Sequence, residues 1–382
     1  MRNAPNMLLI GSTGRNIGKT ELACTLIRRT RPTQPVAAAK ITVIREAGGR
    51  CPRGGEGCGA CTSVDGAYDL MKETNRDGVK DTSRLLLAGA FPVFWLRVHV
   101  AHMREGLDAL YEQIDPHIPL ICESNSIRHA VKPGLFLMVK DKRTRTCKPT
   151  ARAVAHLADI AVGSDGERFD LELERISTRH DTWTLRRKAT AVILAGGQSS
   201  RMGRDKSLLE INGQPLIQRV HEQLQGHFDE ILLSSNDTRH AFLGLKTVAD
   251  RQANQGPLMG IASALEAASH DRVFVVACDI PDIDINLAHR MLNDAEQYDA
   301  VVPRSSPRGG DGPRLEPLFA VYSRSALPLM NDSLAEGRRH VRSIFEKART
   351  CYLDVDAVSA PPNLNTEAEY RAYVDRFDST RR

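Results

Sequence analysis

The sequence predicts an α/β protein with two doubly wound domains, each built on a mostly parallel sheet. Its 382 residues are enough for two such domains. Two short apolar runs, Met7–Ile10 and Ala191–Leu194, each lead into a polar, glycine-containing loop and then into a helix-like segment. Strand-like and helix-like segments continue to alternate in both halves, which is typical of parallel sheets covered by helices. We therefore expect domains at residues 1–185 and 186–382.

Composition indicates a folded protein that binds small anions. Hydrophobic residues make up 41% and charged residues 26% of the chain. The formal net charge of +5 fits nucleotide ligands and does not require nucleic acid. The longest candidate for a membrane span, Phe91–Met103, is interrupted by Arg97, His99 and His102, so no membrane association is expected. The chain starts without a signal-peptide pattern, and we expect a cytoplasmic protein whose eight cysteines are thiols or metal ligands.

The first glycine loop has the residue types of a phosphate-binding loop. It follows a strand-like run and precedes a helix-like one, so its backbone N–H groups would cradle phosphates at the helix N-terminus. Lys19 would reach the outer phosphates, and the Thr20 hydroxyl would hold Mg²⁺. The usual first glycine position is occupied by Thr13, which departs from the plain motif. The expected nucleotide-binding residues of this loop are Gly14, Gly18, Lys19 and Thr20.

Charged residues at other strand ends of the first half would face the same loop. One strand-like run ends in Lys40, and another, Pro119–Asn125, carries Glu123 near its end. Ligands of open α/β sheets bind at this carboxyl edge, so Glu123 would bind Mg²⁺ or take the place of a Walker-B acid. The alternative for Glu123 is a strand-end carboxylate that meets solvent.

These features together resemble the GTP-binding adaptor of molybdopterin guanine dinucleotide synthesis, which has a P-loop NTPase-like fold. The resemblance spans residues 7 to about 165. It rests on the loop Gly11–Thr20, Lys40, Lys80–Thr82, Ala88–Ala90 and Glu123. It implies an accessory domain that binds GTP and assists cofactor hand-over, with a molybdenum-insertion protein and molybdoenzyme chaperones as partners.

A cysteine-rich insertion stands where that family has a histidine-rich stretch. Cys51, Cys58 and Cys61 lie within eleven residues, and the spacing of the last two lets both thiolates face one metal. Zn²⁺ or an iron–sulfur cluster would fit, with the fourth ligand from Cys122, Cys147 or a second subunit. The alternative is a glycine-rich loop with free thiols, and the chain would be a monomer or a homodimer.

The second glycine loop combines two glycines with two cations. Gly196 and Gly197 follow the strand-like run, where their N–H groups can face phosphate oxygens. The planar guanidinium of Arg201 and the point charge of Lys206 suit a triphosphate whose pyrophosphate must leave. The alternative is a glycine-rich turn beside a solvated basic loop.

Polar residues also follow three later strand-like runs in this half. Ser234 and Asn236 end one run, Asp250 ends the next, and Asp279 ends a third. The carboxyl ends of parallel strands share one edge of the sheet, so Asp250 and Asp279 are expected to converge there. A carboxylate at that edge suits Mg²⁺. Each acid has the alternative role of a helix-capping or turn carboxylate.

From Ala191 to Tyr373 the chain resembles the molybdenum cofactor guanylyltransferases, which have a Rossmann-like nucleotidyltransferase fold. The resemblance rests on the loop Val192–Lys206, Cys278–Pro281 and Asn363–Thr366. It implies that Leu194, Ala195, Gly196 and Lys206 bind the nucleotide. It also implies that Asp279 binds Mg²⁺ and that Asp250 lies near the nucleotide.

Two positions bear on the choice of nucleotide. The related cytidylyltransferases tend to have Ala-Ala-Gly where this chain has Ala195-Gly196-Gly197, so the resemblance favours guanine. Ser234 stands where the guanylyltransferases often have Asn, and Asn236 can substitute for it.

The activity implied by the resemblance is transfer of GMP from GTP to the molybdopterin-bound molybdenum cofactor, with release of pyrophosphate. Arg201, Lys206 and Asp279 would be the catalytic residues, and GTP and the molybdopterin cofactor the small-molecule partners. One alternative is nucleotidyl transfer to another phosphate acceptor, either cytidylyl transfer to molybdopterin or transfer to a sugar phosphate. Another is a nucleotide-regulated metallochaperone whose working part is the cysteine loop.

Overall fold

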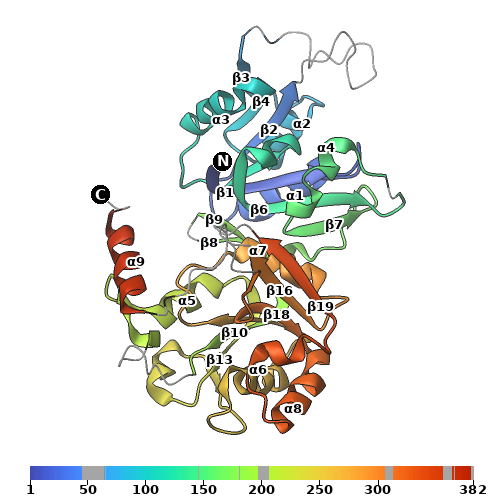
Figure 1. The fold of residues 1–382 in the computed structure, drawn as a ribbon. Helices are drawn as coiled ribbons and strands as arrows, with labels where there is room; N and C mark the ends of the chain where they lie inside the picture. Colours follow the sequence, from blue (N-terminus) through green and yellow to red (C-terminus); the bar gives the residue numbers. More distant parts are fainter. Residues whose placement is uncertain are drawn as a thin grey trace. The chain divides into compact units, whose positions relative to one another are not determined.

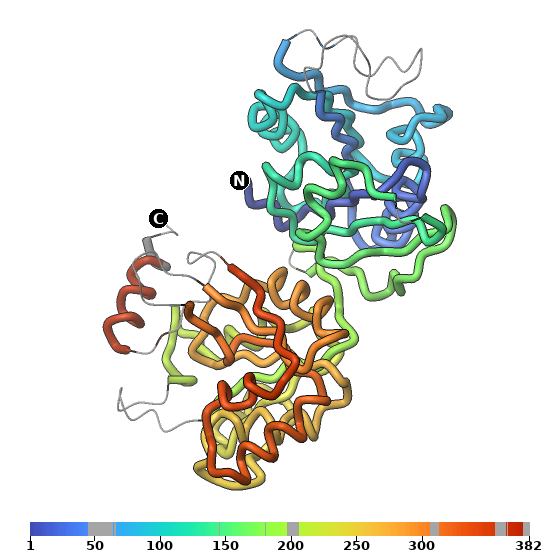
Figure 2. Tube along the Cα trace, turned by 45° about the vertical axis from the view of Figure 1, so that its right-hand side comes forward, coloured from blue at the N-terminus to red at the C-terminus, as the bar shows by residue number. Residues whose placement is uncertain are grey.

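The computed structural model describes residues 1–44, 64, 66–144, 146–179, 181–196, 206–305, 313–355, 364 and 366–379. The chain divides into two compact units, Met1–Leu185 and Arg186–Arg382 (Figure 1). Each unit is one continuous stretch of sequence, as the colours along the trace in Figure 2 show. No helix in these ranges is both long and apolar enough to cross a membrane.

The described part of the first unit is built on a seven-stranded sheet in the order β3-β4-β2-β5-β1-β6-β7. Neighbouring strands pair in parallel, except that the edge strand β3 runs antiparallel to β4. The strands are β1 (Arg2–Ser12), β2 (Ala37–Ile44), β3 (Tyr68–Lys72), β4 (Val93–His99), β5 (Leu120–Glu123), β6 (Val131–Asp141) and β7 (Ile160–Ser164).

Both faces of this sheet are buried. Along β1, Leu8 and Ile10 belong to one apolar cluster, and Met7 and Leu9 belong to a second, because successive side chains of a strand point to opposite faces. The first cluster includes residues of α1 (Lys19–Thr30) and α2 (Asp81–Ala88), and the second includes residues of α3 (Met103–Glu112) and α4 (Pro149–Arg152). The result is three layers, helices on both sides of a central sheet.

The polar stretch before residue 186 is more ordered than its sequence indicates. Its mixed charges and lack of apolar periodicity predict an irregular connection. The structure instead has an antiparallel hairpin, β8 (Ile176–Arg179) and β9 (Thr182–Leu185). Trp183 is 1% exposed and lies in the apolar cluster that contains α1. Three buried apolar residues, Ile176, Trp183 and Leu185, are enough to anchor a segment that is otherwise polar.

The described part of the second unit has an eight-stranded sheet. The order is β14-β13-β10-β15-β18-β16-β17, and β19 also pairs with β16. The pairs among β14, β13, β10 and β15 are parallel, whereas β18 is antiparallel to both β15 and β16. The strands are β10 (Arg187–Leu194), β13 (Phe228–Ser234), β14 (Lys246–Val248), β15 (Arg272–Ala277), β16 (Ala300–Ser305), β17 (Arg314–Leu315), β18 (Phe319–Ser323) and β19 (Thr350–Val355).

Helices cover both faces of this sheet as well. Ala191 and Ile193 of β10 share a cluster with α5 (Leu216–Leu224) and α7 (Ile285–Asp294). Val192 and Leu194 share a cluster with α6 (Gly256–Ala267) and α8 (Leu327–Ala335). The pair Asn212–Gly213, which is typical of a tight turn, joins β11 (Glu210–Ile211) to β12 (Gln214–Pro215). The helix α9 (Glu367–Ser379) follows near the end of the chain.

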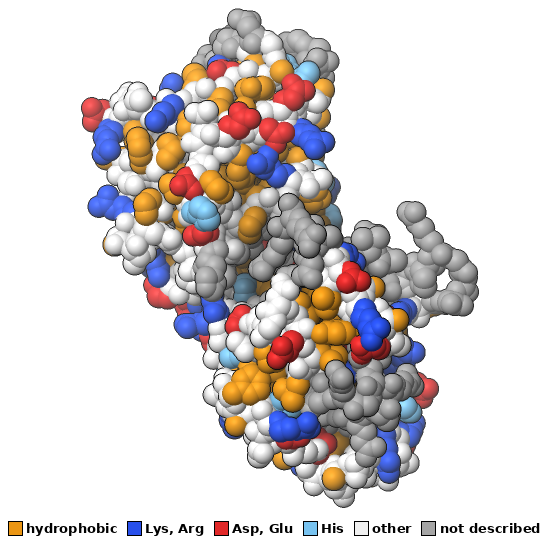
Figure 3. Space-filling model, turned by 90° about the vertical axis from the view of Figure 1, so that its left-hand side faces the viewer, with side chains coloured by type: hydrophobic (Ala, Val, Ile, Leu, Met, Phe, Trp, Pro, Cys, Tyr) orange, Lys and Arg blue, Asp and Glu red, His pale blue; other side chains and the backbone are white. Residues whose placement is uncertain are grey.

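The predicted fold class, two α/β units with mostly parallel sheets, is confirmed. The sheets are mixed, since each contains antiparallel pairs that a simple strand–helix alternation does not predict. The strand β18 begins at Phe319, directly after a turn in which the Phe319 N–H donates to the carbonyl of Glu316. On the face drawn in Figure 3, positive and negative side chains are interspersed, in keeping with the small net charge.

Candidate functional site

In the first unit, the predicted phosphate loop connects β1 to α1. Gly18 adopts a φ of 87° immediately before the helix, in the left-handed region that favours glycine. A Cβ atom on Gly18 would come within 2.8 Å of Ser164 Oγ, so a larger residue would also displace the end of β7. Gly14 lies in the same loop. Lys19 and Thr20 are the first two residues of α1, where backbone N–H groups are free of helical partners.

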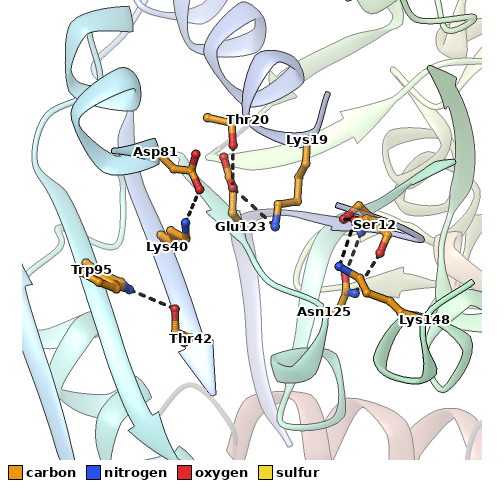
Figure 4. A network of polar contacts seen from close by, with 11 residues as sticks. Ser12, Lys19, Thr20, Lys40, Thr42, Asp81, Trp95, Glu123, Asn125 and Lys148 are labelled. Carbon is orange, nitrogen blue, oxygen red and sulfur yellow. Dashed lines mark hydrogen bonds and ion pairs between the residues drawn. The ribbon is translucent and has the colours of Figure 1, made fainter. Parts of the chain in front are cut away.

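Lys19 and Thr20 meet the carboxylate of Glu123, which ends β5 (Figure 4). Lys19 Nζ lies 3.6 Å from Glu123 Oε2, and Thr20 Oγ1 donates to the same oxygen at 3.2 Å. The Glu123 side chain is fully buried, and burial raises the pKa of this carboxyl despite the attraction of Lys19. Its second oxygen, Oε1, is buried and receives no hydrogen bond from the described residues. The site therefore holds a carboxylate oxygen that a cation can use.

Lys40 and Asp81 form a second ion pair beside Glu123 (Figure 4). Burial by itself would raise the pKa of Asp81, but the hydrogen bond and charge of Lys40 lower it below its ordinary value. Lys40 belongs to β2, which pairs with β5, and Asp81 begins α2. The sequence placed Lys40 at this edge and gave no signal for its pairing with Asp81.

In the second unit, the predicted catalytic pair is in contact. Lys206 Nζ lies 3.3 Å from Asp279 Oδ2. Lys206 begins the short helix η5 (Lys206–Leu208), and Asp279 lies two residues beyond β15. Burial raises the pKa of Asp279, and the positive charge of Lys206 opposes this rise. The two residues are 73 positions apart in sequence, and folding brings their opposite charges together at the carboxyl end of the sheet.

Ser234, Asn236 and Asp250 form a second group at the same edge. Asn236 Nδ2 donates to Asp250 Oδ2 at 2.9 Å, and the N–H of Asp250 donates back to Asn236 Oδ1 at 2.7 Å. Gly260 of α6 lies against this group, because a Cβ there would be 2.9 Å from Ser234 Oγ and 3.4 Å from Asp250 Oδ1. The role of Gly260 is not recognisable from the sequence, because a glycine inside a helix shows its role only through its neighbours in space.

The expected convergence of Asp250 with Asp279 needs a correction. The strands that precede them, β14 and β15, are separated by β13 and β10. Three strand spacings amount to about 14 Å, so the two carboxylates share an edge but cannot bind one ion together. Between them lie Leu194 and Ala195 at the end of β10, where the Ala195 N–H donates to Ser234 O and the Cys278 N–H donates to Leu194 O. An extended ligand can lie across these strand ends.

Comparisons with known proteins locate the relationship in this second unit. The MobA-like NTP transferase domain family matches residues 191–351. A probable molybdenum cofactor guanylyltransferase from Pelotomaculum thermopropionicum is 39% identical over 174 residues, which are 45% of this chain and 82% of that protein. The chain belongs to the molybdenum cofactor guanylyltransferase family. A molybdenum cofactor guanylyltransferase from Vibrio campbellii is 36% identical over 183 residues, 47% of this chain and 91% of that protein.

A crystal structure of molybdopterin-guanine dinucleotide biosynthesis protein A from Archaeoglobus fulgidus is similar at 22% identity and a TM-score of 0.43. The similarity covers 50% of this chain and 99% of that one. The family match and the two guanylyltransferase relatives, which are at least 36% identical, make the second half a nucleotidyltransferase of this family. The family match begins at residue 191, so the role of the first unit has to be argued from its own residues.

Several predicted residues lie outside the described ranges. They are Gly197 and Arg201 of the guanylyltransferase loop and Cys51, Cys58 and Cys61 of the cysteine insertion. Gly196 is described, and no atom of the described residues lies within 4 Å of a Cβ built on it. Cys122, one suggested fourth ligand, is 0% exposed in an apolar cluster, and burial raises the pKa of its thiol. A buried neutral thiol in that position is a poor metal ligand.

Proposed function

We propose that the second unit transfers GMP from GTP to the molybdopterin-bound molybdenum cofactor, forming molybdopterin guanine dinucleotide cofactor and pyrophosphate. The observation that carries this proposal is the contact between Lys206 and Asp279 at the carboxyl end of β10 and β15. A cation and a carboxylate in that place suit a triphosphate and its counter-ion. Membership of the guanylyltransferase family supports GTP as the nucleotide and the molybdopterin cofactor as the acceptor.

Nucleotide binding would span the two groups at the sheet edge. The Asn236–Asp250 pair, held by reciprocal hydrogen bonds, would contact the nucleoside. The backbone at Leu194, Ala195 and Gly196 would follow the phosphates, with the open side of Gly196 allowing close approach. Gly197 and Arg201 of the same loop are proposed to continue this contact.

The transfer itself is a single displacement. An oxygen of the cofactor's terminal phosphate attacks the α-phosphorus of GTP, and the bond from that phosphorus to the oxygen of the β-phosphate breaks. The bonding pair leaves with pyrophosphate, whose growing charge Lys206 and Arg201 would neutralise. A phosphate nucleophile is already ionised near neutral pH, so no strong general base is required. Positioning and charge stabilisation would supply the rate enhancement.

The residues present fit Mg²⁺ in both units. Mg²⁺ prefers oxygen ligands and is commonly held by one or two carboxylates together with substrate phosphates. Asp279 offers such a carboxylate in the second unit, and Thr20 with the unpartnered oxygen of Glu123 offers one in the first. When bound, Mg²⁺ supplies positive charge against the phosphate oxygens. Among the described residues no group of three or more His, Cys, Asp or Glu is arranged as a metal site, which agrees with partial coordination by a nucleotide.

We further propose that the first unit binds GTP as an accessory domain. Its support is the assembly of Lys19, Thr20 and Glu123 at the mouth of the loop between β1 and α1. The proposed partners of this unit are the proteins that supply or receive the cofactor. The cysteine insertion adds a proposed Zn²⁺ or iron–sulfur site.

Pyrophosphate release tests the main proposal. The full-length protein is incubated with Mg²⁺ and the molybdenum cofactor, and with GTP, CTP or ATP in turn. We expect cofactor-dependent release with GTP alone. Release with CTP instead would assign cytidylyl transfer, and no release with any of the three would remove the activity from this chain.

Two substitutions assign the site. Asp279→Ala and Lys206→Ala should each lower kcat by about 100-fold or more, because each removes a charge that faces the reacting phosphates. Asp271→Asn is the matched control. Asp271 lies at the other end of β15 with an 88% exposed side chain paired to Arg324, so this variant should keep normal activity. A folded Asp279→Ala protein with near-normal turnover would refute the site.

A further inference from the structure

A buried histidine connects the two halves of the proposed guanylyltransferase site. His240 belongs to the short helix η6 (Thr238–Leu243) and is 1% exposed. Its Nε2 lies 2.8 Å from Ser207 Oγ, and its Nδ1 lies 3.3 Å from Ser235 Oγ. Both hydroxyl groups belong to buried residues, with Ser207 1% and Ser235 3% exposed.

The two partners of His240 are neighbours of the residues proposed to bind GTP. Ser207 follows Lys206 directly in η5, and Ser235 lies between Ser234 and Asn236. The imidazole therefore joins the segment that carries the phosphate-binding cation to the strand end that carries the nucleoside-binding residues. These segments are about 30 residues apart in sequence, and the hydrogen bond is a direct tie between them.

The position of the imidazole is itself fixed. Asp237 caps η6, since its side chain accepts from the Arg239 N–H at 2.8 Å. The N–H of Asp237 donates to Ser235 Oγ at 3.1 Å, and the N–H of Ser235 donates to Val248 O at 3.0 Å, which ties the strand end to β14. A histidine held in this way can transmit a fixed geometry to Ser207.

We propose that His240 is a positioning residue that sets the location of Lys206 relative to the nucleoside-binding strand end. The inference rests on the proposed function of this site. A three-residue helix has little stability of its own, so η5 depends on contacts such as this one to hold its place. Hydroxyl groups both donate and accept, so either neutral tautomer of the imidazole satisfies Ser207 and Ser235 together. Removal of the imidazole nitrogens would take one hydrogen bond from each of two buried hydroxyls, and η5 would lose its tie to the strand end at Ser235.

Inhibition by pyrophosphate gives a readout that a loss of folded protein does not change. Lys206 is proposed to contact the leaving pyrophosphate, so a displaced Lys206 weakens product binding and slows turnover. The test uses the full-length protein, with kcat and the inhibition constant of pyrophosphate measured against GTP. His240→Phe fills the same space without hydrogen-bonding atoms, and Ser207→Ala removes only the hydroxyl. Both should lower kcat about tenfold and raise the inhibition constant of pyrophosphate about fivefold, because small displacements of a charged group are costly at a reacting centre.

A rescue variant and a control separate positioning from general stability. His240→Gln retains a polar group that reaches Ser207 and should restore both constants to within about twofold of the original protein. His289→Phe is the control, because His289 is equally buried at 1% exposed and lies on α7 beside His227, away from these hydrogen bonds. This control should leave the inhibition constant of pyrophosphate unchanged.

The outcomes are distinguishable. One outcome is that the original protein turns over GTP and that His240→Phe and Ser207→Ala have the same inhibition constant of pyrophosphate as the original protein. This outcome refutes the positioning role and leaves the proposed function intact. A raised inhibition constant in both His240→Phe and Ser207→Ala, with near-normal values in His240→Gln and His289→Phe, supports the positioning role. If the original protein releases no pyrophosphate at all, the proposed function fails first and the inference falls with it.

Discussion

At the residue scale, the proposed chemistry of the second unit depends on one pair of charges in a partly buried place. Lys206 and Asp279 have side-chain exposures of 18% and 20%. Reduced contact with water strengthens the attraction between them and also makes an unpaired charge costly. The positive charge of Lys206 therefore favours the ionised form of Asp279, against the opposing effect of burial on its pKa. A surface pair of the same two residue types would be hydrated and weakly ordered.

The raised pKa of Asp279 predicts the acid side of the pH profile. Burial disfavours the carboxylate, so protonation begins at a higher pH than the ordinary value of 3.8, although Lys206 partly opposes this. The active form needs the carboxylate, and we expect kcat/KM to fall as pH drops through this raised pKa. The measurement is kcat/KM for GTP against pH, with Asp271→Asn as the control whose profile should not move. An acid limb below the ordinary aspartate range would contradict the buried environment.

The raised pKa of Asp279 affects stability in the opposite direction to activity: as pH rises, activity should increase while the free energy of unfolding decreases. Because the folded pKa lies above the unfolded one, ionised Asp279 disfavours the folded state, and the free energy of unfolding decreases as pH rises between the two values. Ionised Asp279 thus lowers the stability of the folded state at the place where we propose that it takes part in the reaction.

At the element scale, the first loop is held by contacts from two other elements. Asn125, after β5, accepts from the Ser12 N–H at 2.8 Å and donates to the Ser12 carbonyl at 3.0 Å. Lys148 Nζ donates to the Gly14 carbonyl at 3.1 Å, and the Ser12 hydroxyl donates to the same carbonyl (Figure 4). The loop is therefore preformed, which lowers the ordering cost of ligand binding. Neither Asn125 nor Lys148 belongs to the glycine motif, so only the structure identifies them.

We expect Lys19 to be required for nucleotide binding by this preformed loop. The original protein should bind two equivalents of GTP per chain, one in each unit. Lys19→Ala removes the cation at the mouth of the first loop and should leave one equivalent, as titration calorimetry would measure. Arg29→Ala, on the last turn of the same helix and paired with exposed Glu174, is the control and should keep two. Two equivalents in Lys19→Ala would refute the phosphate-loop interpretation.

At the scale of the whole molecule, each unit has its own buried clusters on both faces of its own sheet. Separate cores of this size can unfold as separate units. The hairpin β8–β9 belongs to the first of them, because Ile176, Trp183 and Leu185 pack with residues of α1. The boundary between the two units therefore lies between β9 and β10.

Trp183 tests this independence. Trp183→Ala should destabilise the first unit by about 3–5 kcal/mol, the usual cost of removing a large buried aromatic side chain. In calorimetry the first unit's transition should move to lower temperature while the second unit's transition and the guanylyl transfer rate remain. Trp183→Phe should show a smaller shift. A joint shift of both transitions would mean that the units unfold together.

The sequence by itself determined the fold class and most strand ends. The apolar run Ala191–Leu194 is short enough to be a buried strand, and it forms the end of β10. The first glycine loop leads directly into α1, as its glycines followed by Lys19 and Thr20 predict. Asp279 and Glu123 were predicted as site residues because carboxyl strand ends share one edge, whereas Lys206 and Lys19 were predicted from the glycine loops that contain them. The second unit's family membership was also readable in the sequence, because its motifs lie in contiguous stretches.

Only the tertiary structure decided which of these residues meet. The contacts between Lys206 and Asp279, between Lys40 and Asp81, and between His240 and Ser207 join distant segments, and local patterns contain no information on such pairs. The order of strands was equally hidden, and it placed β13 and β10 between the strands that Asp250 and Asp279 follow. The physical reason is that periodicity and turn chemistry act over a few residues, whereas pairing is set by which apolar faces can be buried together.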